Sequence, residues 1–210
     1  MNVGRIIDGP ARVEEGMAAL SARCPRMAAA YRQTGALPLR RKPEGFAQLS
    51  AAIVSQQVSV ASAQAIWGRV EAAGLAAPEA ILSATDDDLR AVGLSRPKQR
   101  YARALAAAGI DYDGLRAMSD EQVIATLVAV PGIGRWTAEI YATFSLGRAD
   151  ILAAGDLALQ ESTRALYDLP ERPTEAQLRR MAEAWSPWRA VAARLLWAYY
   201  RVEKDREGIA

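Results

Sequence analysis

Apolar residues recur at helical spacing along most of the chain. Phe46, Leu49 and Ile53 are separated by three and four residues, which places their side chains on one face of a helix. A half-buried strand would instead alternate with a period of two, and no segment does so convincingly. The frequent alanines favour helices over strands. The pattern therefore predicts an all-α fold of roughly ten or more short helices.

Capping and turn residues mark where several of these helices begin. Ser119 is followed three residues later by Gln122, and Thr174 by Gln177, which is the spacing of a capping box at a helix start. Residues 36–43 contain two prolines and three cationic side chains. This composition predicts an exposed connection between an N-terminal helical segment and the central helices.

A hairpin motif interrupts the helical pattern near the middle of the chain. A helix is expected at residues 119–129, followed by the run VPGIG at residues 130–134, after which helical spacing resumes. Proline ends the first helix, Gly132 and Gly134 permit close backbone approach, and Ile133 can enter the core. The next helix then presents backbone N–H groups and its positive dipole end to an anion such as a DNA phosphate. Taken alone, the motif is more typical of an ordinary tight turn between two helices.

The amino-acid composition removes several kinds of active site. The chain has no histidine, which excludes catalytic triads, histidine-ligated zinc and imidazole acid–base catalysis. Its single cysteine, Cys24, can neither close an internal disulfide nor bind an iron–sulfur cluster, which needs four thiolates. Any catalysis must therefore rest on carboxylates, hydroxyls, lysines or the backbone.

Charge and hydropathy favour a soluble protein. The net charge of +2 is compatible with a local basic face but does not by itself indicate nucleic-acid binding. No apolar run approaches the roughly 18 residues of a membrane span. Asp8, Glu14 and Glu15 stand where a secretory signal needs an uncharged apolar stretch. We therefore expect a cytoplasmic protein without membrane association.

A longer stretch around the hairpin resembles a known family. The run LVAVPGIGRWTAEIYA at residues 127–142, followed by Asp156, is similar to the core of the helix-hairpin-helix (HhH-GPD) DNA glycosylase superfamily, in particular its 3-methyladenine DNA glycosylase II branch. Further segments that agree with this family, in the same order, are residues 52–60, 93–101 and 185–197.

The resemblance implies a specific arrangement of the chain. It predicts one glycosylase unit spanning residues 1–210, built from two helical lobes with the active-site cleft between them. The central lobe would comprise residues 45–150, with the helix-hairpin-helix at about 120–146. The second lobe would combine residues 1–44 with residues 151–210.

The resemblance also implies an activity, that of a monofunctional DNA glycosylase in base excision repair. Such an enzyme hydrolyses the N-glycosidic bond of an alkylated purine, such as 3-methyladenine or 7-methylguanine, flipped out of duplex DNA, and leaves an abasic site. Asp156 matches the catalytic carboxylate, whose charge stabilises an oxocarbenium-like sugar and which can orient or deprotonate the attacking water. Asp156 is also typical of a helix N-cap before Leu157, and both roles can coexist.

Position 136 distinguishes subtypes within the superfamily. Relatives that also cleave the DNA backbone carry a lysine where this sequence has Trp136, and that amine forms a Schiff base with the sugar. An indole cannot do so, and the resemblance therefore implies water as the nucleophile and no AP lyase activity. The absence of four C-terminal cysteines argues against the branches that carry an iron–sulfur cluster.

Tryptophans are the candidates for holding the damaged base. Trp136 and Trp197 match the family's pocket positions, where indoles attract a cationic alkylated purine with about 0.5–2 kcal/mol per contact. Trp67 and Trp185 fit apolar helical faces and are expected in the core. Trp188, at the start of the last helix, is also expected to be structural.

Other matched positions are expected to contact duplex DNA. Gln57 corresponds to the wedge that fills the gap left by the flipped base, whereas Gln56 is explained equally well as a hydrogen-bonding residue at a helix end. The hairpin residues expected at the phosphates are Gly132, Gly134, Arg135 and Thr137. A second basic group, which can approach phosphate or form an ordinary solvated face, comprises Arg96, Lys98, Arg100 and Arg103.

The implied ligands and partners are few. No organic cofactor and no iron–sulfur cluster are expected. Family members often hold a monovalent cation, Na⁺ or K⁺, in the hairpin, here through the backbone carbonyls of Val128, Val130 and Ile133. The expected partner is double-stranded DNA containing damaged bases, bound by a monomer. Two alternatives stay open, a non-enzymatic DNA-binding or damage-sensing module and a helical interaction domain with no DNA role.

Overall fold

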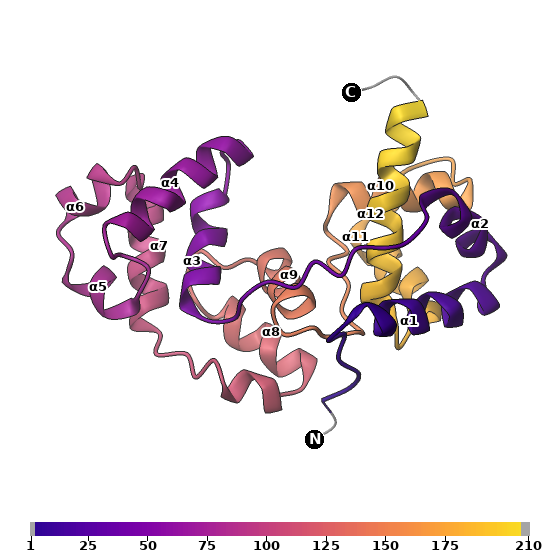
Figure 1. Ribbon diagram of the computed structural model, residues 1–210, viewed down its shortest axis with the longest axis horizontal. Helices are drawn as coiled ribbons and strands as arrows, with labels where there is room; N and C mark the ends of the chain where they lie inside the picture. Colours follow the sequence, from indigo (N-terminus) through magenta and orange to yellow (C-terminus); the bar gives the residue numbers. More distant parts are fainter. Residues whose placement is uncertain (1–2, 207–210) are drawn as a thin grey trace. The chain divides into compact units, whose positions relative to one another are not determined.

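The computed structural model describes residues 3–206 and is helical throughout (Figure 1). These residues form twelve α-helices and two 3-10 helices, with no strand beyond an isolated bridge between Ile6 and Arg148. The predicted all-α fold is therefore confirmed. Within the described part of the chain, every helix is too short or too polar to cross a bilayer.

The contacts within the chain divide it into two compact units. The first unit spans Lys42–Tyr141, and the second combines the described residues before Lys42 with those after Tyr141. The expected central lobe extended to residue 150, whereas residues 142–150 belong to the second unit. Residues 1–2 and 207–210 of the expected second lobe lie outside the described residues.

The first unit is a group of short helices around α7. Its elements are α3 (Phe46–Ser55), α4 (Val60–Ala72), α5 (Pro78–Ser83), α6 (Asp86–Ala91), α7 (Arg96–Ala107), η1 (Gly114–Ala117), α8 (Asp120–Val128) and most of α9 (Arg135–Phe144). Helix α7 packs against α3, α5 and α6. Leu49, Ile53 and Leu105 are almost completely buried, as their helical spacing predicts. Trp67 is only half-buried, contrary to expectation, and Val70 is the one residue of α4 that is fully buried.

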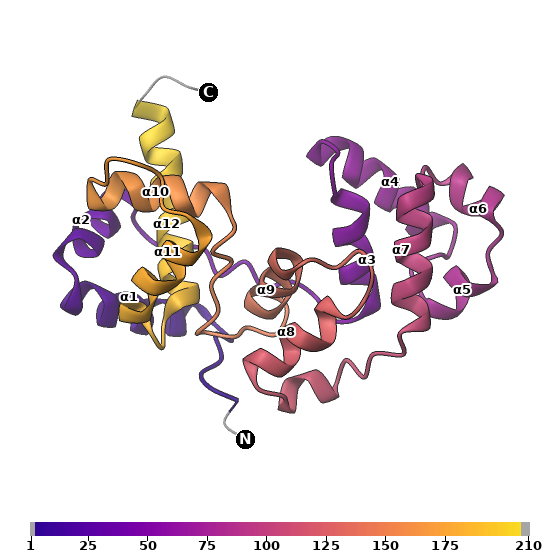
Figure 2. The ribbon, with the colours of Figure 1, turned by 180° about the vertical axis from the view of Figure 1, so that it is seen from behind.

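The second unit is organised around the long C-terminal helix (Figures 1 and 2). Its elements are α1 (Pro10–Arg23), α2 (Pro25–Thr34), α10 (Leu157–Tyr167), α11 (Glu175–Met181), η2 (Ala182–Trp185) and α12 (Arg189–Arg206). Helix α12 packs against α1, α2 and α10. Trp185 and Trp188 lie in this core, 3% and 4% exposed, which confirms their predicted structural role.

Local capping predicted from the sequence is present in both units. The Ser119 hydroxyl accepts from the Gln122 amide at the start of α8, and Thr174 does the same with Gln177 at the start of α11. The connection at residues 36–43 is irregular and mostly exposed, as predicted. Leu39 within it nevertheless packs against the second unit's core.

A buried segment leads from α9 to the start of α10. Residues 142–149 are all buried, and Arg148 donates a hydrogen bond to the Val3 carbonyl at 2.6 Å. The Ile7 amide donates to the Gly147 carbonyl at 2.7 Å. The N-terminal segment therefore fixes this connection from one side, and the connection in turn places the residues that precede Asp156.

Candidate active site

The hairpin between α8 and α9 is packed so closely that one glycine is required. Gly132 has a φ of +94°, and a Cβ there would lie 2.4 Å from Tyr101 Cγ. The Gln56 side-chain amide donates to the Gly132 carbonyl at 2.9 Å. Open space surrounds Gly134, and its φ is not positive. Close approach by other protein atoms is therefore confined to Gly132, and approach of DNA to Gly134 stays a prediction.

Helix α9 begins directly after the hairpin, at Arg135. Its first intrahelical bond runs from the Ala138 amide to the Gly134 carbonyl at 3.1 Å, so the preceding amides have no acceptor inside the helix. No acidic residue stands in the first turn. Arg135 is exposed and forms an ion pair of 2.9 Å with the buried Glu139 carboxylate. Thr137 is only 7% exposed, and its role at a phosphate stays a prediction.

The two glutamines at the end of α3 have different environments. Gln56 is the C-cap residue, and its side chain bridges to the hairpin. The interpretation of Gln56 as a hydrogen-bonding residue at a helix end is therefore confirmed. Gln57 adopts the left-handed conformation, with a φ of +56°, and is exposed. This turn presents Gln57 to solvent, while its role as a wedge stays a prediction.

Half of the second basic group is used inside the protein. The Lys98 ammonium donates to the Val54 carbonyl at 2.7 Å, and burial lowers its pKa. Arg103 donates to the Ile81 carbonyl and pairs with Asp86. These cations donate hydrogen bonds to carbonyls in the last turns of neighbouring helices, where the carbonyls have no N–H partner within the helix. The exposed members that remain for phosphate are Arg96 and Arg100.

Asp156 caps helix α10 and is only half-buried. One of its carboxylate oxygens, Oδ1, accepts hydrogen bonds from the Ala158 and Leu159 amides at 3.0 and 3.1 Å. The N-cap interpretation is therefore confirmed. Because the carboxylate is fixed by the positive end of the helix, its negative charge is stabilised there and its orientation is defined.

Trp197 lies beside this carboxylate. The indole N–H donates to Asp156 Oδ1 at 3.3 Å, and the indole ring packs against Phe144 with centroids 5.6 Å apart. The structure therefore brings together two residues that are 41 positions apart and that the family resemblance assigned to the catalytic carboxylate and to the base pocket. Trp136, in the other unit, is 48% exposed and presents its indole at the start of α9.

The residues expected to hold a cation are backbone positions of the hairpin. Val130 and Ile133 are buried, and the Val130 carbonyl already accepts from the Ile133 amide at 3.0 Å. Val128 is 42% exposed at the end of α8. Residues 3–206 contain no cluster of acidic or cysteine side chains suited to a metal ion, and the cation in the hairpin stays a prediction.

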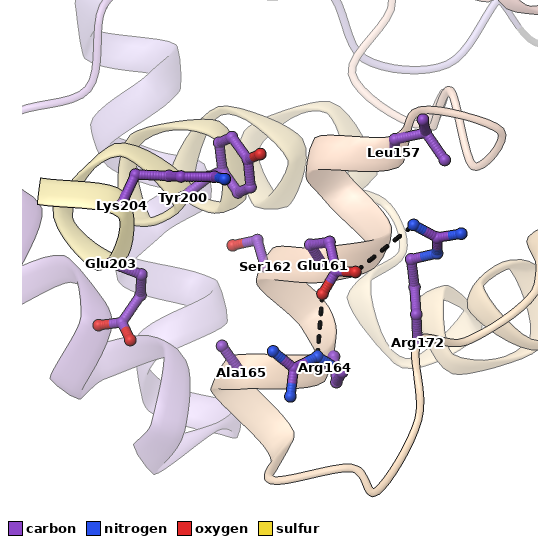
Figure 3. Close-up of a pocket in the computed structure, with 9 residues that line it drawn as sticks. All are labelled: Leu157, Glu161, Ser162, Arg164, Ala165, Arg172, Tyr200, Glu203 and Lys204. Carbon is purple, nitrogen blue, oxygen red and sulfur yellow. Dashed lines mark hydrogen bonds and ion pairs between the residues drawn. The ribbon is translucent and has the colours of Figure 1, made fainter. Parts of the chain in front are cut away.

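A pocket of 420 Å³ opens between α10 and α12 close to Leu157 (Figure 3). Glu161 lies at its centre and pairs with Arg164 at 2.9 Å and with Arg172 at 3.4 Å. Lys204 lies over the Tyr200 ring. Because Glu161 at the centre is already paired with two arginines, we assign this pocket no substrate.

Sequence reasoning missed Phe144, which contacts Trp197, and Arg194, which contacts Phe144. Phe144 packs against the Trp197 ring. The Arg194 guanidinium lies over Phe144, 4.9 Å from the centroid of its ring. A signal was available, because Arg194 interrupts an otherwise apolar run at residues 190–200 that is buried for most of its length. A single cation in such a run indicates a buried charge with a specific task.

Comparison with known proteins agrees with this geometry. A family model described as the HhH-GPD superfamily of base excision DNA repair proteins matches residues 50–188. DNA-3-methyladenine glycosylase 1 of Schizosaccharomyces pombe is 33% identical over 165 residues, which cover 74% of this chain and 72% of that protein.

Two solved structures are similar over most of the chain. DNA-3-methyladenine glycosidase from Bacillus halodurans is 33% identical with a TM-score of 0.83, and the match covers 96% of this chain and 94% of that one. The 3-methyladenine DNA glycosylase of S. pombe, in complex with abasic DNA, is 31% identical with a TM-score of 0.74 and coverages of 87% and 95%. This chain therefore belongs to the HhH-GPD superfamily of base excision DNA repair proteins, within its 3-methyladenine DNA glycosylase branch.

Proposed function

We propose that this protein is a DNA glycosylase that hydrolyses the N-glycosidic bond of alkylated purines, of the 3-methyladenine and 7-methylguanine type, and leaves an abasic site. The observation that carries this proposal is the Asp156 carboxylate, oriented by two backbone amides and by the Trp197 indole. The 3-methyladenine glycosylases to which the chain is similar support the choice of substrate.

The chemistry follows from the charge that develops when the base leaves. Departure of the base makes the deoxyribose oxocarbenium-like, and a fixed carboxylate stabilises that positive charge. The same carboxylate can orient or deprotonate the water that attacks the sugar. Alkylation makes the purine cationic, so the indoles of Trp136 and Trp197 can attract it through their faces. Excision then needs no histidine and no organic cofactor.

We propose water rather than an amine as the nucleophile. The position after Arg135 holds Trp136, whose indole cannot form the Schiff base that a lyase requires. Asp156 therefore acts on water, and the product keeps an intact backbone. The exposed amide end of α9, Arg135 and the Gln57 turn would hold the duplex, with the protein acting as a cytoplasmic monomer. The carbonyls of Val128, Val130 and Ile133 would hold a Na⁺ or K⁺ ion in the hairpin.

The experiment that tests the proposal measures release of free base from methylated duplex DNA. We expect the wild-type protein to release 3-methyladenine and to leave abasic sites, and borohydride to trap no covalent protein–DNA adduct. Efficient trapping would overturn the hydrolytic mechanism. Binding of abasic-site DNA without any base release would instead identify a damage-sensing module.

A further inference from the structure

We propose that Arg194 is a positioning residue for Asp156 and acts through Phe144 and Trp197. These four side chains form a continuous stack within the second unit, from the guanidinium to the carboxylate. The inference rests on the proposed function, because it assigns Arg194 to the orientation of the carboxylate that performs the chemistry.

The first member of the stack is a buried charge held by carbonyls. Arg194 is 2% exposed and donates to the Leu39 carbonyl at 3.1 and 3.3 Å and to the Ala190 carbonyl at 2.8 Å. Among the described residues, no carboxylate pairs with it. Burial lowers its pKa to about 10, with a further contribution from Arg40 and Arg41, and it remains charged at neutral pH.

The second member is the ring that separates Arg194 from Trp197. Phe144 is 6% exposed, and the guanidinium carbon lies 4.9 Å from its centroid. The Trp197 ring packs on Phe144 with centroids 5.6 Å apart and a tilt of 33°. A cation near a phenyl ring is attracted by its face, so Arg194 limits the motion of Phe144. Phe144 in turn provides the surface against which the indole rests.

The last contact joins the stack to the chemistry. Trp197 stands three residues after Arg194 on α12, and its indole N–H donates to the same Asp156 oxygen that caps α10. A rotation of the indole would move or break this hydrogen bond. The two backbone amides would still hold the carboxylate, but the hydrogen bond from the indole would be lost.

The presence of a charge at this position needs an explanation beyond packing. A buried ion without an opposite charge is costly, and an apolar side chain of similar size often serves a core equally well. The planar guanidinium has several N–H donors, which an apolar side chain lacks. Here it joins three parts of the unit: the 36–43 connection through the Leu39 carbonyl, α12 through the Ala190 carbonyl, and the Phe144 ring. We infer that this linkage is retained because it fixes the indole that contacts Asp156.

The test is a double-mutant cycle read by single-turnover base excision. We expect Arg194→Met to slow 3-methyladenine release about tenfold, since small misplacements of reacting groups have large effects on rate. Affinity for abasic-site DNA should change less than about twofold. In a Trp197→Phe background, where the indole N–H is absent, Arg194→Met should slow release less than about twofold further. Equal effects in both backgrounds would overturn the proposal.

A second readout does not depend on activity. The indole N–H resonance of Trp197, assigned by its loss in Trp197→Phe, should shift and exchange about tenfold faster in Arg194→Met. The matched control is Arg189→Met, which removes another arginine of α12 that contacts Asp150 and not this stack. An unchanged indole resonance in Arg194→Met, or an equal change in Arg189→Met, would contradict the positioning role.

The proposal stays testable if Arg194→Met does not fold or if the wild-type protein releases no base. If Arg194→Met does not fold, Phe144→Leu removes the central ring, and the same loss of coupling to Trp197 is expected. If the wild-type protein releases no base, the proposed function fails, while the indole resonance still decides whether Arg194 positions Trp197.

Discussion

The N-termini of α9 and α10 differ in the source of the anion that their backbone amides suit. At the start of α10, the Asp156 carboxylate accepts the Ala158 and Leu159 amides, so the protein supplies its own anion. At the start of α9, Gly134 precedes the helix and no acidic residue stands in the first turn. We therefore expect the positive end of that helix to attract an anion from outside the protein.

The difference shows how one residue at a helix start decides which anion is bound. A carboxylate at the N-cap satisfies the amides and fixes its own position, which suits a group that must act on a substrate. A glycine leaves the amides available and keeps side-chain atoms away, which suits contact with a phosphate.

The largest effect is expected from Asp156→Asn. Asparagine also caps helices well, so the fold and the α10 terminus should persist while the negative charge is lost. We expect base release to slow at least about 100-fold, in line with the usual contribution of a positioned acid–base group. Single-turnover excision of 3-methyladenine measures this change. Turnover equal to that of the wild type would remove Asp156 from the mechanism.

The hairpin itself should respond strongly to Gly132→Ala. The added methyl group would meet Tyr101, and φ at this position is +94°, which an L-residue rarely adopts. We expect the free energy of unfolding to fall by about 2 kcal/mol, a typical cost of such strain, as measured by urea denaturation. Gly134→Ala is the matched control and should cost far less, because open space surrounds Gly134. Equal losses at both positions would argue against close packing of the hairpin on Tyr101.

A smaller effect is expected when the α9 terminus is made to resemble that of α10. Gly134→Asp places a carboxylate where the amides would meet phosphate, and we expect affinity for duplex DNA to fall about tenfold through repulsion. Gly134→Asn adds a side chain of nearly the same shape without the charge and controls for its bulk. Binding titrations at several salt concentrations measure the effect. The same loss for aspartate and asparagine would show that bulk, not charge, was responsible.

The smallest effect concerns the capping role of Asp156 alone. Asp156→Ala should lower the free energy of unfolding by about 1 kcal/mol relative to Asp156→Asn, because alanine cannot accept the two amides. Both variants lack the carboxylate, so their excision rates should be similarly low. Denaturation midpoints compare the two proteins. If they unfold at the same urea concentration, the N-cap contributes nothing measurable to stability.

Much of the fold and part of the site could be predicted from local spacing. Helical periodicity predicted an all-α chain, and capping boxes located the starts of α8 and α11. The hairpin and the capping role of Asp156 were also visible, because each depends on residues no more than about four positions apart. Such short-range hydrogen bonds form in the same way whatever packs around them.

Tertiary structure decided which polar groups are used inside the protein. Lys98 and Arg103 belong to one basic group in the sequence, yet both donate hydrogen bonds to backbone carbonyls of other helices. Trp67 and Trp185 both fit apolar faces, yet packing leaves Trp67 partly exposed and buries Trp185 in the core. Packing also brings Trp197 to Asp156. The burial of Arg194 against Phe144 likewise depends on segments far apart in the chain. These outcomes depend on how separate helices pack, and residue spacing along one helix carries no information about that.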